Sequence, residues 1–193
     1  MDPVFVLPWP EFVVAERLQK LLKKKEGYSI LVPLSRQEEG IDLAILHSGA
    51  NGKSKTTTIQ VKASRTYIHT APKRKGVVRY QFNTWFNRFT VPDRADYVIL
   101  VGMYAPDSGR TKRVSAKWYR DCSLLFTKRE MRDFLADCKT VKGKPDKMFG
   151  FGFNDMNRII LSRGDQSRSR KDFSAYLLDR RLAKLRRKSG HPI

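Results

Sequence analysis

Three polar side chains interrupt two apolar segments in the first half of the chain. Asp42 lies within Gly-Ile-Asp-Leu-Ala-Ile-Leu, and Gln60 and Lys62 lie two residues apart within Ile-Gln-Val-Lys. Side chains two apart on a β-strand leave the same face, and a hairpin would bring Asp42 to that face too. Acidic and basic groups are costly to bury unless they are paired or hold a ligand. We therefore expect an acid, an amide oxygen and an ammonium group to meet at one edge of a sheet.

These groups suit metal-assisted hydrolysis of a phosphodiester bond. Mg²⁺ prefers hard oxygen ligands and retains several waters, so the carboxylate of Asp42 and the side-chain carbonyl of Gln60 would suffice beside a substrate phosphate. Lys62 would position or activate the attacking water and stabilise the charge that develops on the phosphate. The same residues equally fit a structural ion pair between Asp42 and Lys62, with Gln60 merely exposed.

The surrounding sequence predicts the elements that would hold these residues. Residues 10–25 carry apolar side chains at helical spacing, begin with Pro10 and are followed by Gly27, so a helix is expected there. A turn-rich segment at 48–55 favours a hairpin. The expected strands are residues 28–34, 40–47, 56–63 and 96–104, the last of them buried on both faces.

The rest of the chain predicts further helices and strands. Trp85, Phe86 and Phe89 follow Asn83 at helical spacing and predict a short helix with its rings in the core rather than stacked on bases. The other expected elements are a helix after the capping box Thr127–Glu130, strands over Phe149–Phe153 and Arg158–Ser162, and a final basic helix over 173–188. We expect one α/β domain over 1–193, with its core at about 10–104 and an extension carrying the basic helix at about 105–193.

The composition indicates a folded protein with an acidic polymer as its partner. Its 193 residues, 40% of them hydrophobic, can bury a core without disulfide or metal support. The 39 Lys and Arg residues exceed the 19 Asp and Glu residues by 20, which makes nucleic acid the leading partner and an anionic membrane surface the second. The side chains expected to contact nucleic acid are Arg65, Lys73, Arg74, Lys75 and Arg79, with a second basic surface at 168–171 and 180–188.

The cysteines and the start of the chain bear on its location. Cys122 and Cys138 lack C-x-x-C spacing, so buried free thiols in a reducing compartment are expected rather than a disulfide or a metal site. The apolar start has no basic segment and is interrupted by prolines, and no apolar run approaches the ~18 residues of a membrane span. We therefore expect a cytoplasmic protein without a membrane partner.

The order of these features resembles the PD-(D/E)XK, or restriction endonuclease-like, nuclease superfamily. A helix, a strand, a strand with Asp42 and a strand with Gln60-x-Lys62 follow one another as in that family, over roughly residues 10–104. The resemblance implies a mixed β-sheet flanked by helices, with Asp42 and Gln60 as metal ligands and Lys62 as a catalytic residue. It also implies a Mg²⁺- or Mn²⁺-dependent endonuclease that hydrolyses DNA in preference to RNA, and it leaves a homodimer open.

An acid of the first helix often completes the site in this family. We assign this position to Glu16, which borders the apolar stripe beside Phe12, because Glu11 lies in the first turn, where an acid stabilises the helix in any case. Gly40 and Ile41 stand where the family name expects proline, and Gln60 replaces an acid, which removes one negative charge from the metal site. The alternatives are a catalytically inactive nucleic-acid-binding module of the same fold and a basic protein that docks on ribosomes or an anionic membrane.

Overall fold

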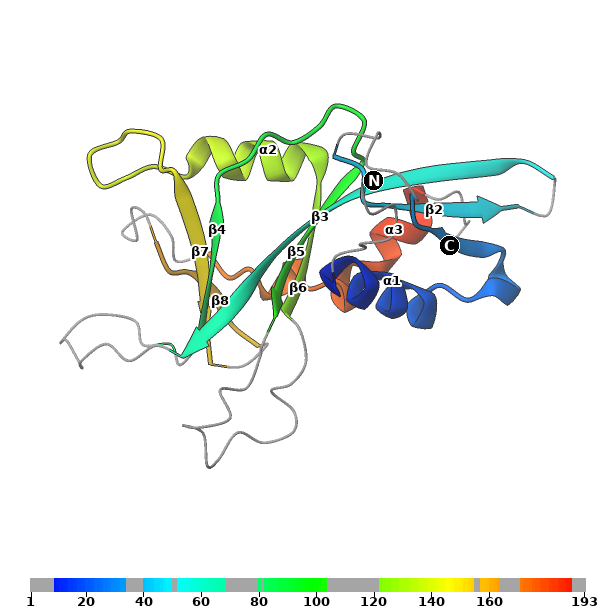
Figure 1. The fold of residues 1–193 in the computed structure, drawn as a ribbon, viewed down its shortest axis with the longest axis horizontal. Coiled ribbons are helices and arrows are strands. Elements are labelled where there is room, and N and C mark those ends of the chain that lie inside the picture. The colour runs from blue at the N-terminus through cyan, green and yellow to red at the C-terminus, as the bar shows by residue number, and fades with distance from the viewer. Residues whose placement is uncertain are drawn as a thin grey trace, which may run out of the picture.

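The computed structural model describes residues 9–33, 40–49, 52–68, 80, 82–103, 122–154, 157–163 and 171–188. Within these ranges the chain forms an α/β fold with an eight-stranded mixed sheet and three α-helices (Figure 1). The helices are α1 (Trp9–Leu21), α2 (Lys128–Asp137) and α3 (Leu182–Lys188). The strands are β1 (Tyr28–Leu31), β2 (Leu43–Ser48), β3 (Ser54–Ile68), β4 (Phe82–Asn87), β5 (Tyr97–Met103), β6 (Cys122–Thr127), β7 (Met148–Phe153) and β8 (Ile159–Leu161).

The sheet is organised around β3, which runs through both of its halves (Figure 1). The strand order is β1-β2-β3-β4-β7-β8, while β5 also pairs with β3 and β6 pairs with β5. Only β3 and β5 run parallel among the described pairs, so the predicted mixed sheet is confirmed. β3 pairs with β2 through 54–59 and with β4 through 66–68, and among the described strands only β5 pairs with it through 60–65. The sheet therefore has a gap between β2 and β4.

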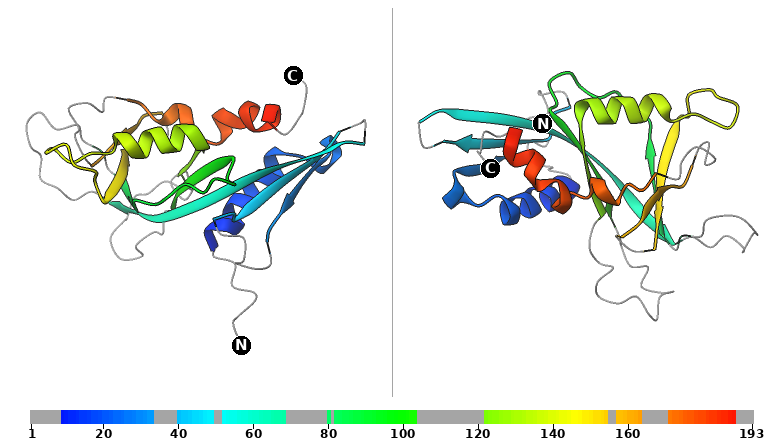
Figure 2. Two further views of the ribbon diagram at one scale, coloured as in Figure 1. Left: turned by 90° about the horizontal axis from the view of Figure 1, so that it is seen from above. Right: turned by 180° about the vertical axis from the view of Figure 1, so that it is seen from behind.

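Two apolar clusters cover opposite faces of the central strands. Val98 and Leu100 of β5 pack with α2 and with phenylalanines of β4 and β7. Tyr97 and Ile99 belong to the second cluster, which includes residues of α1 and α3. Figure 2 shows α2 over the half of the sheet with β4 and β7, and α1 and α3 beside the half with β1 and β2. The prediction that the segment 96–104 is a strand buried on both faces is confirmed over Tyr97–Met103.

The first helix is shorter than predicted. α1 ends at Leu21, and a 3₁₀ turn over Lys24–Glu26 leads to Gly27, whose φ of +81° ends the segment. Because the basic residues 23–25 follow α1 as exposed side chains, they do not extend its buried face. Phe12, expected on the apolar stripe, is 49% exposed.

The short helix predicted after Asn83 is wrong, because this segment is strand β4. Aromatic and β-branched residues suit a pleated, half-buried surface, and β4 pairs with both β3 and β7. Phe86 stacks on Phe149 of β7 with ring centroids 5.4 Å apart, so the expected burial of this ring in the core is confirmed. A short aromatic segment fits both a helical spacing and the alternation of a strand, and here pairing with neighbouring strands decides in favour of the strand.

The final helix is also shorter than predicted. The segment 173–188 contains 3₁₀ turns over Ser174–Tyr176 and Asp179–Arg181, and only Leu182–Lys188 is α-helical. Leu177 forms an isolated β-bridge with Leu124, which interrupts the helical hydrogen bonding at this point.

Two motifs of the second half are confirmed. Thr127 accepts the backbone N–H of Glu130 and the Glu130 carboxylate accepts that of Thr127, which is a complete capping box for α2. Phe149–Phe153 lies in β7, and a Cβ on Gly150 would lie 2.7 Å from the carbonyl oxygen of Thr84. Glycine is therefore required for this close approach of β4 to β7.

Both cysteines are buried free thiols, as predicted, and burial raises the pKa of Cys138 to about 12. In the described part of the chain, no helix is both long and apolar enough to cross a membrane.

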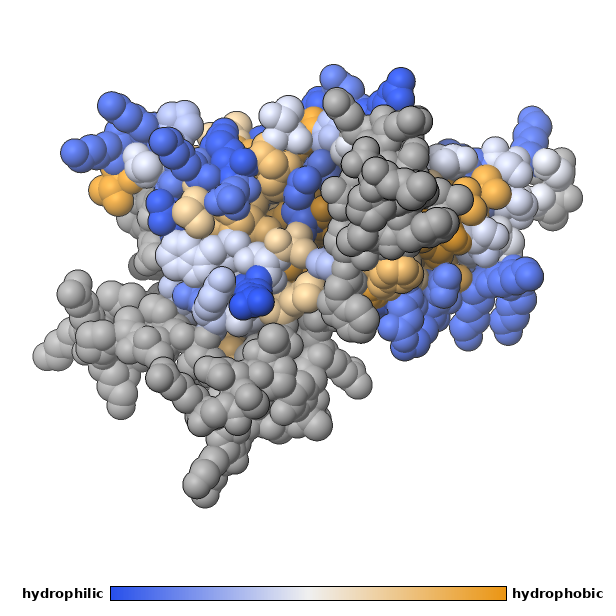
Figure 3. Space-filling view, viewed as in Figure 1, coloured by the Kyte–Doolittle hydropathy of each residue, from blue (hydrophilic) through white to orange (hydrophobic). Residues whose placement is uncertain are grey.

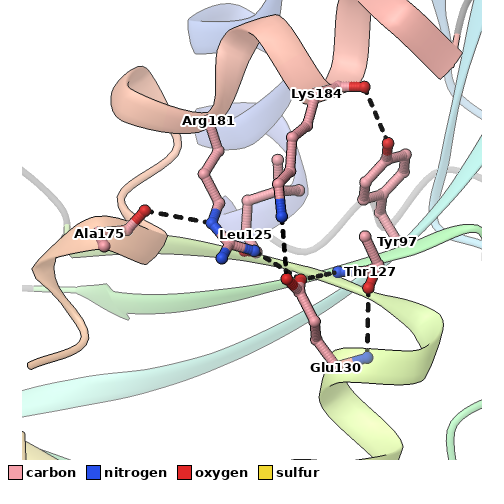
Figure 4. A network of polar contacts seen from close by, with 7 residues as sticks. All are labelled: Tyr97, Leu125, Thr127, Glu130, Ala175, Arg181 and Lys184. Atoms are coloured by element: carbon pink, nitrogen blue, oxygen red, sulfur yellow. Dashed lines mark hydrogen bonds and ion pairs between the residues drawn. The ribbon is translucent and has the colours of Figure 1, made fainter. Parts of the chain in front are cut away.

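A half-buried ionic network attaches the C-terminal segment to the sheet (Figure 4). The Glu130 carboxylate accepts hydrogen bonds from Arg181 at 2.5 Å and Lys184 at 3.0 Å, and the Tyr97 hydroxyl donates to the Lys184 carbonyl oxygen at 3.0 Å. Arg186 pairs with Glu26 at 3.1 Å. Three of the six basic residues of the 180–188 segment are thus engaged in ion pairs within the protein, and the predicted second basic surface stays a prediction for the others.

We expect the Glu130→Gln variant to lower the free energy of unfolding by about 2 kcal/mol at neutral pH, because it weakens charge-assisted hydrogen bonds. Burial alone would raise the pKa of Glu130, but the hydrogen bonds from Arg181, Thr127 and Lys184 outweigh it and lower the pKa from 4.5 to about 2. The difference between wild type and variant should be complete above pH 4.5 and should decline as the pH falls towards about 2.

Urea unfolding over this pH range measures the effect. Asp133→Asn is the control on the same helix, because its exposed carboxylate pairs with Arg129 at 3.8 Å and should contribute less than about 0.5 kcal/mol. Equal losses in the two variants would contradict a structural role for Glu130.

Candidate functional site

Asp42, Gln60 and Lys62 meet at the gap between β2 and β4. Leu43 is the first residue of β2 and pairs with Ile59. The backbone N–H of Asp42, just before β2, also donates to the Ile59 carbonyl at 3.0 Å, so the regular pairing ends here. Ile59 packs in the cluster with α1, and Gln60 and Lys62 therefore leave the opposite face of β3. The Asp42 carboxylate reaches β3 between these two residues, at the backbone of Val61.

The Asp42 carboxylate lies where the hydrogen bonding of β2 to β3 ends. Its Oδ2 accepts the backbone N–H of Val61 at 2.6 Å. Val61 lies just beyond the residues of β3 that pair with β2. Burial raises the pKa of Asp42, whereas the Val61 N–H and the positive charge of Lys62 act in the opposite direction. These two interactions only partly offset the free-energy cost of burying the ionised carboxylate. A cation next to Asp42 would therefore stabilise its charged form.

Gln60 contributes a buried amide with an unpartnered oxygen. The residue is 3% exposed, and its Oε1 has no hydrogen-bond donor among the described residues. Such a polar atom is costly unless a ligand pairs with it. Gln60 is thus not the exposed side chain that the purely structural interpretation required.

Gly40 keeps the space beside this amide open. Its φ is +75°, which a proline cannot adopt, so the departure from the family name at this position has a conformational reason. A Cβ at Gly40 would collide with the Pro92 ring and lie 3.3 Å from the Gln60 Nε2 atom. Glycine is therefore needed here.

Lys62 is half-buried against an aromatic ring. Its Nζ lies 5.6 Å from the centroid of Phe89, within the range of a cation–π interaction. Within the described ranges, Lys62 forms no ion pair, by the criterion of an N···O distance of at most 4.0 Å, with Asp42 or with any other carboxylate. The direct Asp42–Lys62 ion pair of the structural interpretation is therefore not formed.

Glu16 does not join these three residues. Its exposed carboxylate pairs with Lys20 one turn along α1, at 2.5 Å. The buried face of α1 contains Leu18, which lies about 200° around a helix from Glu16. Glu11 lies seven residues before Leu18, on the sheet-facing side of the helix, and is half-buried. This side of α1 packs with Ile59, on the face of β3 opposite Gln60 and Lys62.

The predicted nucleic-acid contacts are described only in part. Arg65 is an exposed residue of β3 and, three positions from Lys62, leaves the opposite face of the strand. Lys73, Arg74, Lys75 and Arg79 lie outside the described residues.

The donor set at the gap fits a hard divalent cation. One carboxylate and one amide oxygen are enough for Mg²⁺, which keeps several waters and takes further oxygens from a phosphate. The described residues contain no group of three or more His, Cys, Asp or Glu side chains that could hold a metal ion.

Comparison of the chain with family models, with curated proteins and with solved structures found no match in any of the three.

Proposed function

We propose that this protein is a metal-dependent endonuclease of the restriction endonuclease-like type that hydrolyses phosphodiester bonds in DNA. The observation that carries the proposal is the Asp42 carboxylate on the Val61 N–H at the gap in the sheet, where Val61 stands between Lys62 and Gln60, whose buried Oε1 has no described partner. The net charge of +20 supports a polyanionic substrate.

Each residue has a distinct role in this proposal. Asp42 and Gln60 would hold Mg²⁺ or Mn²⁺ through their oxygens, and a bound ion would supply Lewis acidity and a more acidic water. Lys62 would orient the attacking water and place its positive charge against the developing negative charge on the phosphate. Phe89 would keep the Lys62 ammonium in position without neutralising it.

A cleavage assay tests the proposal. Purified protein is incubated with supercoiled plasmid, linear duplex and branched DNA, each with Mg²⁺, Mn²⁺ or EDTA. We expect cleavage with either metal and none with EDTA. A protein that binds these DNAs but never cuts them would support the inactive binding module instead.

We expect the Gln60→Glu variant to bind Mn²⁺ roughly tenfold more tightly than wild type, since it adds a charged ligand. Without metal, a second carboxylate next to Asp42 should lower the melting temperature, because two like charges then share a buried site. Calorimetric titration with Mn²⁺ and melting curves with and without the ion check both effects. A melting temperature that falls and does not recover with Mn²⁺ would show that residue 60 is not a ligand.

A further inference from the structure

A hairpin rich in lysine connects α2 to β7. Residues 139–147 have the sequence Lys-Thr-Val-Lys-Gly-Lys-Pro-Asp-Lys, and we name this segment the lysine hairpin. It projects beyond the end of α2 at the upper left of Figure 1. In the space-filling view, hydrophilic side chains gather over it and an apolar patch lies at its outer end (Figure 3).

The hairpin is held by its own backbone. Lys139 bridges to Pro145, and the Thr140 N–H donates to the Lys144 carbonyl at 2.8 Å. The turn passes through Gly143, whose φ is +76°. These contacts order the backbone that carries the lysines before any partner binds, which lowers the entropic cost of binding.

The base of the hairpin is fixed to the body of the protein. The backbone N–H of Arg88 donates to the Lys147 carbonyl at 2.8 Å, and its guanidinium donates to the Cys138 carbonyl at 3.3 Å. Asp146, the one acid of the hairpin, accepts from Arg163 at 3.2 Å and is therefore neutralised locally.

The four lysines have no acidic partner. Lys139, Lys142, Lys144 and Lys147 are exposed, and none of them forms an ion pair with any residue in the described ranges. This contrasts with Arg181, Lys184 and Arg186 of the C-terminal segment, which are paired with glutamates. The hairpin thus presents four exposed cations without a described ion pair within nine residues.

Among the described residues, Val141 is the most exposed of the large apolar side chains. It is 86% exposed and lies between the lysines at the outer end of the hairpin. A single exposed apolar residue is common, but an apolar side chain among cations is also what proteins place against the sugars and base edges of a DNA groove.

The hairpin and the candidate site are linked through two consecutive residues. Arg88 holds the base of the hairpin, and Phe89 lies against the Lys62 ammonium. Phe89 also packs against Phe149 of β7, the strand that the hairpin enters, with ring centroids 6.2 Å apart. One rigid part of the fold therefore carries both features.

We propose that the lysine hairpin grips duplex DNA next to the candidate site, with its lysines on phosphates and Val141 against the groove. This rests on the proposed function only in requiring that DNA is bound, not that it is cut. The hairpin fixes where the duplex lies relative to Lys62, and it adds a contact that does not depend on DNA sequence.

Binding to a 30-base-pair duplex is measured by fluorescence anisotropy at several salt concentrations, in an Asp42→Asn background that separates binding from cutting. The test variant is Lys142→Gln, Lys144→Gln and Lys147→Gln combined. The control combines Lys23→Gln, Lys24→Gln and Lys25→Gln, three exposed lysines after α1 that give the same change in net charge. We expect the hairpin variant to lower the salt-dependence slope by about 2–3 and the affinity at least tenfold at ~0.1 M salt, with little change in the control.

The Val141→Ser variant provides an independent readout. It should weaken binding severalfold while leaving the salt slope unchanged, because it removes no charge. Equal losses in the two triple variants would overturn the proposal, since the effect would then come from net charge alone. Loss of binding to phosphatidylserine vesicles with unchanged DNA binding would also overturn it, in favour of a membrane contact. DNA binding that requires the hairpin in a protein that never cuts would support this inference and contradict the nuclease.

Discussion

The Lys62→Ala variant is expected to cut DNA roughly 10²–10³-fold more slowly than wild type, while its affinity for DNA stays nearly unchanged. The lost ammonium would act on the attacking water or the developing charge, so its effect appears in the transition state. One cation among 39 basic residues contributes little to the total electrostatic attraction of DNA. The stability of the variant should fall by only about 1 kcal/mol, because the contact with Phe89 is lost and no ion pair with Asp42 is broken.

Cleavage rate, DNA affinity and melting temperature are measured on the same preparation. Lys55→Ala is the matched control, since Lys55 is an exposed lysine of the same strand and gives the same change in charge. A folded, DNA-binding Lys62→Ala protein that cuts as fast as wild type would remove Lys62 from the mechanism. A stability loss of roughly 3–5 kcal/mol would instead indicate a broken buried ion pair.

The elements around the site were predictable because short segments of the sequence determine them. The alternation of apolar residues and the turn-rich segment between β2 and β3 predicted the hairpin, and the two-residue spacing of Gln60 and Lys62 predicted their shared face. The capping box of α2 and the alternation of Phe and Gly in β7 were equally local signals. Each of these elements forms where backbone propensity and the apolar pattern agree.

The errors arose where distant contacts decide the structure. Trp85, Phe86 and Phe89 follow a helical spacing, yet pairing with β3 and β7 makes Phe82–Asn87 a strand. The final helix is interrupted at Leu177 because this residue bridges to Leu124, more than fifty positions earlier. Sequence patterns within a short window do not contain these pairings.

Two features of the site also depended on the fold. The gap in the sheet exists because β3 changes partner from β2 to β4, which no single segment indicates. The unpartnered state of Gln60 Oε1 is equally a property of the packed structure.

The raised pKa of Asp42 means that removing its charge should affect stability in the opposite way from removing the charge of a carboxylate that stabilises the fold. Asp42→Asn should weaken Mn²⁺ binding at least tenfold, because it removes the only charged ligand proposed. It should not lower stability, since the asparagine oxygen can still accept the Val61 N–H and the cost of burying a charge disappears. A raised pKa means that the ionised form disfavours folding, so the variant should be the more stable protein above that pKa, and the difference should vanish as the pH falls below it.

Asp146→Asn provides the opposite case. Although burial alone would raise it, the pKa of Asp146 is lowered by hydrogen bonds from Arg163 and from backbone amides, and the carboxylate lies in an ion pair of 3.2 Å. This variant should lose stability at neutral pH, with the loss shrinking in acid, and should keep the Mn²⁺ affinity of wild type. Calorimetry with Mn²⁺ and urea unfolding at neutral and acidic pH compare the two variants. If Asp42→Asn is destabilised as Asp146→Asn is and binds Mn²⁺ as wild type does, Asp42 is a structural residue and the metal site at the gap is refuted.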